Sequence, residues 1–195
     1  VIDGMKEFME SDYANIHRGA YDLSMRSSLL YDASKEAVAK CLGGVSPYEV
    51  VFTYNATYAF NLITRSLIKT GILQKWDHVL LSKAEHHANI VPWEIIREEY
   101  GITIDWAEVH PDGTIDYEDI AKKLPWVKVV SITWASNVTG EVLDIAKIRD
   151  IIDSSSGQEK PLLIIDGSQR FPHMMTDVRK YGIDIFVGTG NKVMS

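Results

Sequence analysis

The sequence predicts an α/β fold with three layers, in which helices cover both faces of a mostly parallel sheet. Short apolar runs such as Leu162 to Ile165 alternate along the chain with stretches of helical periodicity. A run that is apolar at every position indicates a strand buried on both faces, which is typical of parallel sheets. The length of 195 residues suffices for one such domain or for part of a larger enzyme.

The composition excludes several classes of protein. The hydrophobic fraction of 46% and the charged fraction of 24% are ordinary for a globular chain, and the net charge of −7 argues against binding to nucleic acid or anionic membranes. No apolar run approaches the ~20 residues of a membrane span, and no signal segment opens the chain. A single cysteine, Cys41, excludes an internal disulfide, so we expect a cytoplasmic protein.

The N-terminal region contains a polar segment and a helix. Met5 to Arg26 is weakly periodic and includes a predicted loop at Asn15 to Gly19. Apolar residues at helical spacing predict a helix from Ser28 to Leu42, which the following two glycines would end. Cys41 lies on the apolar face of this helix, so we expect it in the core and not as a nucleophile.

A candidate phosphate cradle follows. Val50 to Thr53 is predicted to be a short buried strand, and a turn leads from it into a helix that ends near Lys69. The free amides of a helix N-terminus bind phosphate, and the Thr57 hydroxyl would add a donor. Thr57 is equally compatible with an ordinary N-cap.

The remaining elements alternate regularly between strands and helices, which predicts one α/β domain. The expected strands are Val79 to Ser82, Thr103 to Ala107, Val127 to Thr133, Leu162 to Asp166 and Ile183 to Val187. The expected helices begin near Pro92, at Asp116 and at Ile145. Ser154 to Gly157 resembles a linker but is too short to separate domains.

Two strand ends place an acid and an amine at the same sheet edge. Asp166 ends one apolar run, and Lys192 follows the next one. Ligands of open α/β sheets bind at this carboxyl edge. His86 and His87 follow an earlier strand, but adjacent side chains diverge and no third ligand is suitably spaced, so no metal site is expected. His86 is better suited to stack on a flat ring, or is simply a loop residue.

Nucleotide-binding signatures are absent. The chain contains no G-x-G-x-x-G after its first strand, no G-x-x-x-x-G-K-[ST] and no G-x-S-x-G. Gly188 to Lys192 is similar to a phosphate loop, yet its lysine is neither preceded by glycine nor followed by Ser or Thr. These absences favour a different cofactor that carries a phosphate.

The chain resembles the class V aminotransferase-like enzymes of the fold-type I pyridoxal-phosphate group, most closely the cysteine desulfurase and selenocysteine lyase branch. The resemblance rests on motifs spread in order over most of the chain. They are Asn15 to Gly19 (N-A-N-x-H-R-G), Phe52 to Asn61 (V-F-T-x-G-T-T-E-A-I-N), Glu85 to Trp93 (E-H-H-A-N-x-x-P-W), Ser136 to Gly140 (S-N-V-x-G), Asp166 to Gln169 (D-G-A-Q) and Thr189 to Lys192 (S-G-H-K).

The resemblance implies a pyridoxal 5'-phosphate (PLP) site. Lys192 would carry the cofactor as a Schiff base and then move protons, and Asp166 would keep the ring nitrogen protonated. His86 would stack on the ring and act as an acid or base, and Gln169 would donate to the phenolic oxygen. Asn137 would lie near that oxygen and the substrate carboxylate. The phosphate would be held by Ala56, Thr57, Thr189 and Asn191.

Several positions depart from the family pattern. The glycine, first threonine and glutamate of the phosphate motif are Asn55, Ala56 and Tyr58, so one hydroxyl is lost. The histidine before the lysine is Asn191, which cannot titrate, and Ser168 replaces an alanine beside the cofactor. These departures indicate a divergent member whose substrate is less certain than its cofactor.

The resemblance also implies an activity and partners. The expected reaction converts cysteine to alanine and enzyme-bound sulfur, in a homodimer that passes sulfur to an acceptor protein. Residues 1–27 would cover the site, and residues 28–195 would form the PLP-binding large domain. The catalytic cysteine and the substrate-binding arginine of desulfurases lie beyond the cofactor lysine, so we expect the chain to be part of a longer enzyme.

Other functions remain open at this point. They are a class V aminotransferase, another β-eliminating lyase, a non-catalytic fragment or partner-binding module, and a nucleotide-binding domain that uses Thr57.

Overall fold

A computed structural model describes residues 1–156, 159–174 and 176–193. These residues form two compact units, each described here by itself. The first unit contains Val1–Phe52 together with Thr176 and Asp177, and the second contains Thr53–Met174 and Val178–Val193. The expected boundary between residues 27 and 28 falls inside helix α2 (Asp22–Cys41).

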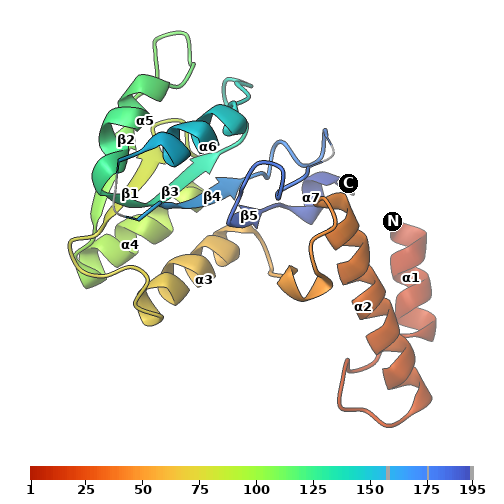
Figure 1. Cartoon of the computed structure of the whole chain (residues 1–195). Coiled ribbons are helices and arrows are strands. Elements are labelled where there is room, and N and C mark those ends of the chain that lie inside the picture. The colour runs from red at the N-terminus through yellow and green to blue at the C-terminus, as the bar shows by residue number, and fades with distance from the viewer. Residues whose placement is uncertain (157–158, 175, 194–195) are drawn as a thin grey trace. The chain divides into compact units, whose positions relative to one another are not determined.

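The second unit is built on a five-stranded sheet with the order β2-β1-β3-β4-β5 (Figure 1). All neighbouring strands are parallel, which confirms the predicted α/β class. The strands are β1 (His78–Ser82), β2 (Thr103–Ala107), β3 (Val127–Thr133), β4 (Leu162–Asp166) and β5 (Ile185–Val187). The apolar runs therefore correspond to strands, although β5 begins two residues later than predicted.

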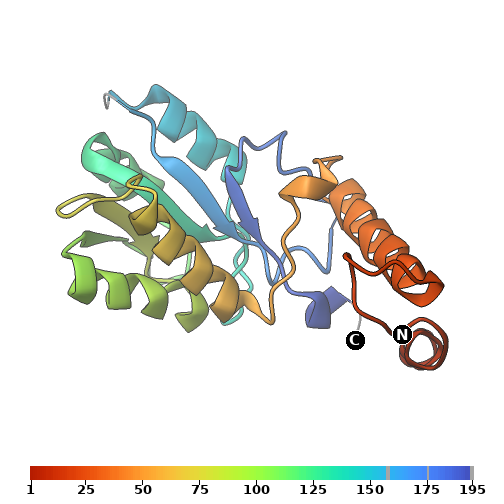
Figure 2. The ribbon, with the colours of Figure 1, turned by 90° about the horizontal axis from the view of Figure 1, so that it is seen from below.

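Helices cover both faces of this sheet (Figure 2). The covering helices are α3 (Ala56–Lys69), α4 (Val91–Tyr100), α5 (Tyr117–Lys123) and α6 (Ile145–Ser154). The unit also contains the short helices η2 (His87–Asn89), η3 (Leu124–Trp126) and α7 (Gly190–Val193). One core lies under α3 and α4 and includes the fully buried Phe60 and Trp93. A second core lies under α5 and α6 and includes Ile120 and Ile148. None of the described helices has the length and apolar character of a membrane span.

The strand predicted at Val50 to Thr53 does not form. This stretch is irregular, and the side chains of Val51 and Phe52 are 68% and 46% exposed. An apolar β-branched run becomes a strand only if a neighbouring strand satisfies its backbone groups. The edge strands of the sheet are β2 and β5, and neither of them pairs with this segment.

The first unit contains α1 (Ile2–Ser11), α2 and the short helix η1 (Pro47–Glu49). The loop between α1 and α2 is attached to α2 by serine hydroxyls. Ser24 Oγ donates to the carbonyl oxygen of Asn15 at 2.9 Å, and Ser28 Oγ accepts from the His17 amide at 2.9 Å. The predicted loop at Asn15 to Gly19 is therefore confirmed, and it is ordered by side chains of the following helix.

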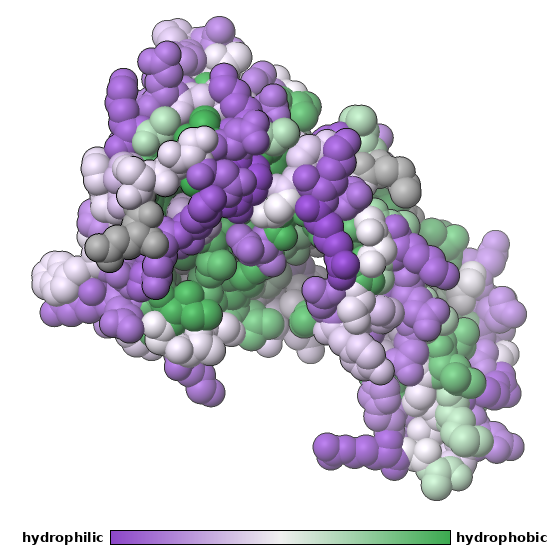
Figure 3. All heavy atoms as spheres, viewed as in Figure 1, coloured by the Kyte–Doolittle hydropathy of each residue, from purple (hydrophilic) through white to green (hydrophobic). Residues whose placement is uncertain are grey.

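The prediction that Cys41 lies in the core is wrong, because its side chain is exposed. The buried residues of α2 are the small Ser24, Ser27 and Ala39, whereas Leu29 is 69% exposed. Leu29 and Leu30 of α2 thus remain at the surface of the described chain. Figure 3 shows green apolar spheres among purple ones on one face of the molecule. The helical spacing of apolar residues predicted an apolar face on this helix, but it could not predict whether another element packs against that face.

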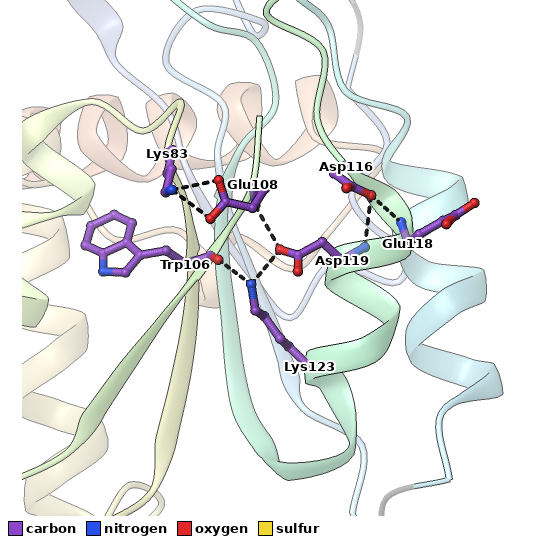
Figure 4. Close-up of polar contacts among 7 residues, drawn as sticks. All are labelled: Lys83, Trp106, Glu108, Asp116, Glu118, Asp119 and Lys123. Carbon is purple, nitrogen blue, oxygen red and sulfur yellow. Dashed lines mark hydrogen bonds and ion pairs between the residues drawn. The ribbon is translucent and has the colours of Figure 1, made fainter. Parts of the chain in front are cut away.

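Helix α5 is attached to the edge strand β2 by a cluster of charged groups (Figure 4). Lys123 Nζ donates to the carbonyl oxygen of Trp106 at 2.7 Å and to Asp119 Oδ2 at 2.5 Å. The same Asp119 oxygen accepts from the Glu108 amide at 2.9 Å. Asp116 caps the helix by accepting from the amides of residues 118 and 119. These bonds stabilise the end of β2 where no further strand pairs with it.

We therefore expect Lys123→Met to lower the free energy of unfolding by about 1 kcal/mol, because the change removes a charge-assisted hydrogen bond to a strand carbonyl. Urea unfolding of the whole chain measures this difference. Lys122→Met is the matched control, since Lys122 is exposed on the same helix. Equal stability of the two variants would contradict the anchoring role of Lys123.

Candidate functional site

The carboxyl edge of the sheet gathers most of the predicted site residues. Because the strands are parallel, their C-terminal ends meet at one edge, and the loops that follow them share it. The residues on these loops are His86 after β1, Asn137 after β3, Asp166 and Gln169 at the end of β4, and Thr189, Asn191 and Lys192 after β5. The register pairs Asp166 with Thr133 of β3 and with Val187 of β5, so these ends are adjacent.

The N-terminus of α3 lies at the same edge. Helix α3 leads into the start of β1, so it runs antiparallel to the strands, and it packs against η2 and β5. Asn55 Oδ1 accepts from the Tyr58 amide at 2.8 Å and caps the helix. The residue that replaces the expected glycine is therefore a cap, and the amides of Ala56 and Thr57 still have no helix carbonyl to bond.

Asp166 carries a buried carboxylate. The residue is 4% exposed, and its Oδ1 accepts a hydrogen bond from the Ser168 amide at 2.9 Å. No ion pair formed by the described residues involves Asp166. Burying an unpaired carboxylate is unfavourable, and a cationic ring nitrogen would relieve that cost.

Gly167 is required immediately after this carboxylate. A Cβ at this position would lie 2.1 Å from the ring of Phe186, in the neighbouring strand. The backbone amide of Gly167 donates to the Val187 carbonyl oxygen at 2.8 Å. The close approach of the Phe186 ring therefore keeps the turn after Asp166 in register with β5.

Two hydroxyl groups near these strand ends have no partner among the described residues. Ser168 Oγ and Thr189 Oγ1 are both buried and both lack a hydrogen bond. They lie two residues beyond the paired positions Asp166 and Val187 of adjacent strands. Buried hydroxyls are normally bonded, so acceptors on a ligand would complete this region. These hydroxyl donors fit a cofactor that carries a phosphate, and the acceptor Asp166 fits a protonated ring nitrogen.

His86 has a defined ring orientation. Its Nδ1 accepts from the Ala88 amide at 3.1 Å, so the neutral ring carries its proton on Nε2. The ring of His87 lies at 78° to it, with centroids 6.4 Å apart. The described residues contain no group of three or more His, Cys, Asp or Glu side chains that could hold a metal ion.

The remaining predicted residues differ in exposure. Ala56 is buried and Gln169 is half-buried, whereas Thr57, Asn137, Asn191 and Lys192 are exposed. Lys192 lies in the short helix α7, and among the described residues no hydrogen bond or ion pair engages its amine. The topology brings the predicted site residues to one edge of the sheet. Among the described residues, the carboxylate of Asp166 accepts one hydrogen bond, from the Ser168 amide.

Sequence reasoning missed Glu85. Its Oε1 accepts from Ser82 Oγ at 2.5 Å and from the Thr133 amide at 2.8 Å, and its Oε2 accepts from Asn89 Nδ2 at 2.7 Å. Burial and, to a smaller extent, the charge of Asp166 raise the pKa of Glu85 to about 7, against the lowering effect of these hydrogen bonds. Glu85 stands in the motif with His86, but no sequence signal indicated its buried partners.

Comparison with known proteins agrees with this geometry. The model of the aminotransferase class-V family matches residues 1–195. The chain belongs to this family. It is 33% identical over 194 residues to a cysteine desulfurase of Pectobacterium atrosepticum, and this match covers 99% of the chain and 46% of that protein. A probable cysteine desulfurase of Halalkalibacterium halodurans is 30% identical, with 99% and 47% covered.

The fold matches solved structures equally well. A cysteine desulfurase from Thermococcus onnurineus superimposes with a TM-score of 0.89 at 26% identity, over 98% of this chain and 46% of that one. The chain thus spans about half the length of the relatives it matches. The predicted fold-type I class and the family resemblance are confirmed.

The pKa of Glu85 predicts a pH dependence of stability. A pKa raised from 4.5 to about 7 means that the folded protein binds this proton more tightly than the unfolded chain does. The resulting stabilisation is fully present below pH 4.5 and is lost as the pH rises through 7, with a total of about 3 kcal/mol at most.

We expect the free energy of unfolding of the wild type to fall between pH 4.5 and 7 relative to that of Glu85→Gln. Denaturant unfolding at a series of pH values measures the difference between the two curves. Glu108→Gln controls for the loss of an exposed carboxylate. Parallel curves for the wild type and Glu85→Gln would contradict this prediction, because they would show that Glu85 has the same pKa in the folded and unfolded protein.

Proposed function

We propose that the chain forms the cofactor-binding half of a PLP-dependent enzyme that converts cysteine to alanine and enzyme-bound sulfur. The observation that carries the proposal is the buried, unpaired carboxylate of Asp166 at the end of β4. Family membership supports it, since relatives of this chain are named cysteine desulfurases. The activity belongs to the whole protein, of which this chain spans about half the length seen in those relatives.

Asp166 would hold the proton on the cofactor's ring nitrogen. When bound, PLP supplies an electron sink for negative charge at the Cα atom of an amino acid. A buried carboxylate at the ring nitrogen raises that nitrogen's pKa, because an opposite charge at short range favours the charged form. Gln169, three residues further along the same turn, would donate to the phenolic oxygen.

His86 would stack on the cofactor ring and present its Nε2 proton outwards. Since Nδ1 accepts from the Ala88 amide, Nε2 is the nitrogen that remains for acid–base exchange near the substrate. Asn137, on the loop after β3, would bind near the phenolic oxygen and the substrate carboxylate. Lys192 would hold the cofactor covalently and move the Cα proton.

The phosphate would be bound at the N-terminus of α3 and the end of β5. Amides of Ala56 and Thr57, the Thr57 hydroxyl, Thr189 Oγ1 and the Asn191 side chain supply donors. The unpartnered state of Thr189 Oγ1 in the described chain supports its assignment. Ala56 provides no hydroxyl, whereas the family motif has a threonine at this position. Backbone amides would therefore supply a larger share of the phosphate donors in this chain.

The proposal extends to partners. We propose that the whole protein is a cytoplasmic homodimer that passes sulfur to an acceptor protein. Its catalytic cysteine and its substrate-binding arginine would lie outside this chain. With the full-length protein and a thiol reductant that releases the enzyme-bound sulfur as sulfide, a desulfurase gives alanine and sulfide from cysteine, whereas a class V aminotransferase would give an oxo acid. Analysis of these products separates the two activities.

We expect PLP to give a visible absorption band that borohydride reduction fixes to Lys192, and Lys192→Ala to abolish that band. Absorption spectra and mass spectrometry of the reduced peptide measure both results. Lys180→Ala is the matched control, because Lys180 is a lysine near the same end of the chain. A band that persists in Lys192→Ala would show that another residue holds the cofactor. Failure of the wild type to bind PLP would favour a non-catalytic module.

A further inference from the structure

We propose that Glu85 is a positioning residue of this site, whose carboxylate ties the turn that carries His86 to the end of β3. It would thereby set where the imidazole of His86 lies. The functional consequence rests on the role proposed above for His86, whereas the positioning itself depends only on contacts within this chain.

The first contact replaces a missing strand bond. Strands β1 and β3 pair up to Leu81 and Ser131, and β1 ends at Ser82. Beyond this point the backbone amide of Thr133 has no carbonyl of β1 to bond. Glu85 Oε1 takes this position and accepts the amide's hydrogen bond at 2.8 Å. The carboxylate thus extends the ladder between the two strands after the backbone of β1 has turned away.

The second contact closes the turn from its other end. Asn89 Nδ2 donates to Glu85 Oε2 at 2.7 Å, and Asn89 Oδ1 accepts from Ser131 Oγ at 2.6 Å and from Trp93 Nε1 at 3.1 Å. Asn89 and Ser131 are fully buried. Both ends of the segment from Glu85 to Asn89 are therefore bonded to β3, which lies in the centre of the sheet.

His86 lies between these two anchored ends. Its carbonyl oxygen accepts from the Asn89 amide at 2.8 Å, and its Nδ1 accepts from the Ala88 amide. The backbone position and the ring orientation of His86 thus both depend on the turn that Glu85 closes. The side chain remains exposed while its support is buried, which is the arrangement expected of a group that must meet a ligand in one orientation.

Glutamine cannot replace Glu85 in this network. All the groups that face the carboxylate are donors: the Ser82 hydroxyl, the Thr133 amide and the Asn89 side-chain amide. A glutamine presents one acceptor and one NH₂ group, so its nitrogen would face a donor. The charged group that acts on Glu85 from a neighbouring strand is Asp166 of β4, so the wild-type carboxylate should also respond to pH.

The test uses NMR of the full chain without added PLP, comparing wild type, Glu85→Gln and the control Glu108→Gln. At a pH above 7, where the wild-type carboxylate is charged, we expect Glu85→Gln to accelerate hydrogen exchange of the Thr133 amide at least about ten-fold, through loss of a charge-assisted bond. At high pH the ¹⁵N shifts of His86 should report a single Nε2–H tautomer in the wild type and a mixture in Glu85→Gln. Glu108→Gln should match the wild type.

A titration of the wild type decides the matter even if Glu85→Gln fails to fold. The Thr133 amide shift should change with a single inflection near pH 7, as Glu85 loses its proton. A flat Thr133 titration, or unchanged His86 signals in a folded Glu85→Gln, would overturn the inference. Addition of PLP then tests the proposed function separately: a wild type that shows the expected apo signals but does not bind PLP would refute the function and leave the positioning intact.

Discussion

The parallel ladder of the sheet is the constraint on which the rest of this structure depends. Each parallel strand requires a crossover before the next one can pair, so helices must lie on both faces and every strand must end at the same edge. The central strands β1, β3 and β4 are largely buried between the two helical layers, so most of their positions are apolar. Chemistry is therefore confined to the few residues that follow β1, β3, β4 and β5.

Two acids meet at this edge under different conditions. Asp166 is buried and bonded to one backbone amide, and Glu85 is bonded to three donors. The charge of Asp166 acts on Glu85, and burial raises the pKa of Glu85 to about 7. Glu85 has its donors from the protein itself, whereas Asp166 has capacity left for a cation. This difference supports the positioning role that we propose for Glu85 and the binding role that we propose for Asp166.

The elements that sequence predicted best are those whose environment is uniform. Leu162 to Asp166 is apolar on both faces because helices cover both, so its pattern matched the observed strand at each residue. Val50 to Thr53 has a similar composition, yet neither edge strand, β2 or β5, pairs with it. Composition reports what a segment can bury, and pairing depends on residues elsewhere in the chain.

The same reasoning explains the outcomes at single residues. We predicted roles for Asp166 and His86 because their residue types and their places in a motif point to chemistry. No role was predicted for Glu85, since burial in the folded chain raises its pKa and one of its hydrogen-bond donors, Thr133, is 48 residues away. Cys41 was misplaced because the apolar positions of α2 are left at the surface of the described chain. Properties that arise from distant neighbours cannot be read from local pattern.

The central claim is that Asp166 holds the proton of a bound cofactor's ring nitrogen. The most direct measurement is the ¹⁵N resonance of that nitrogen in ¹⁵N-labelled PLP bound to the protein. The account predicts a pyridinium resonance in the wild type and a neutral pyridine resonance in Asp166→Asn, whose side-chain amide would donate to the nitrogen instead. A pyridinium resonance in both proteins, or a neutral one in the wild type, would contradict it.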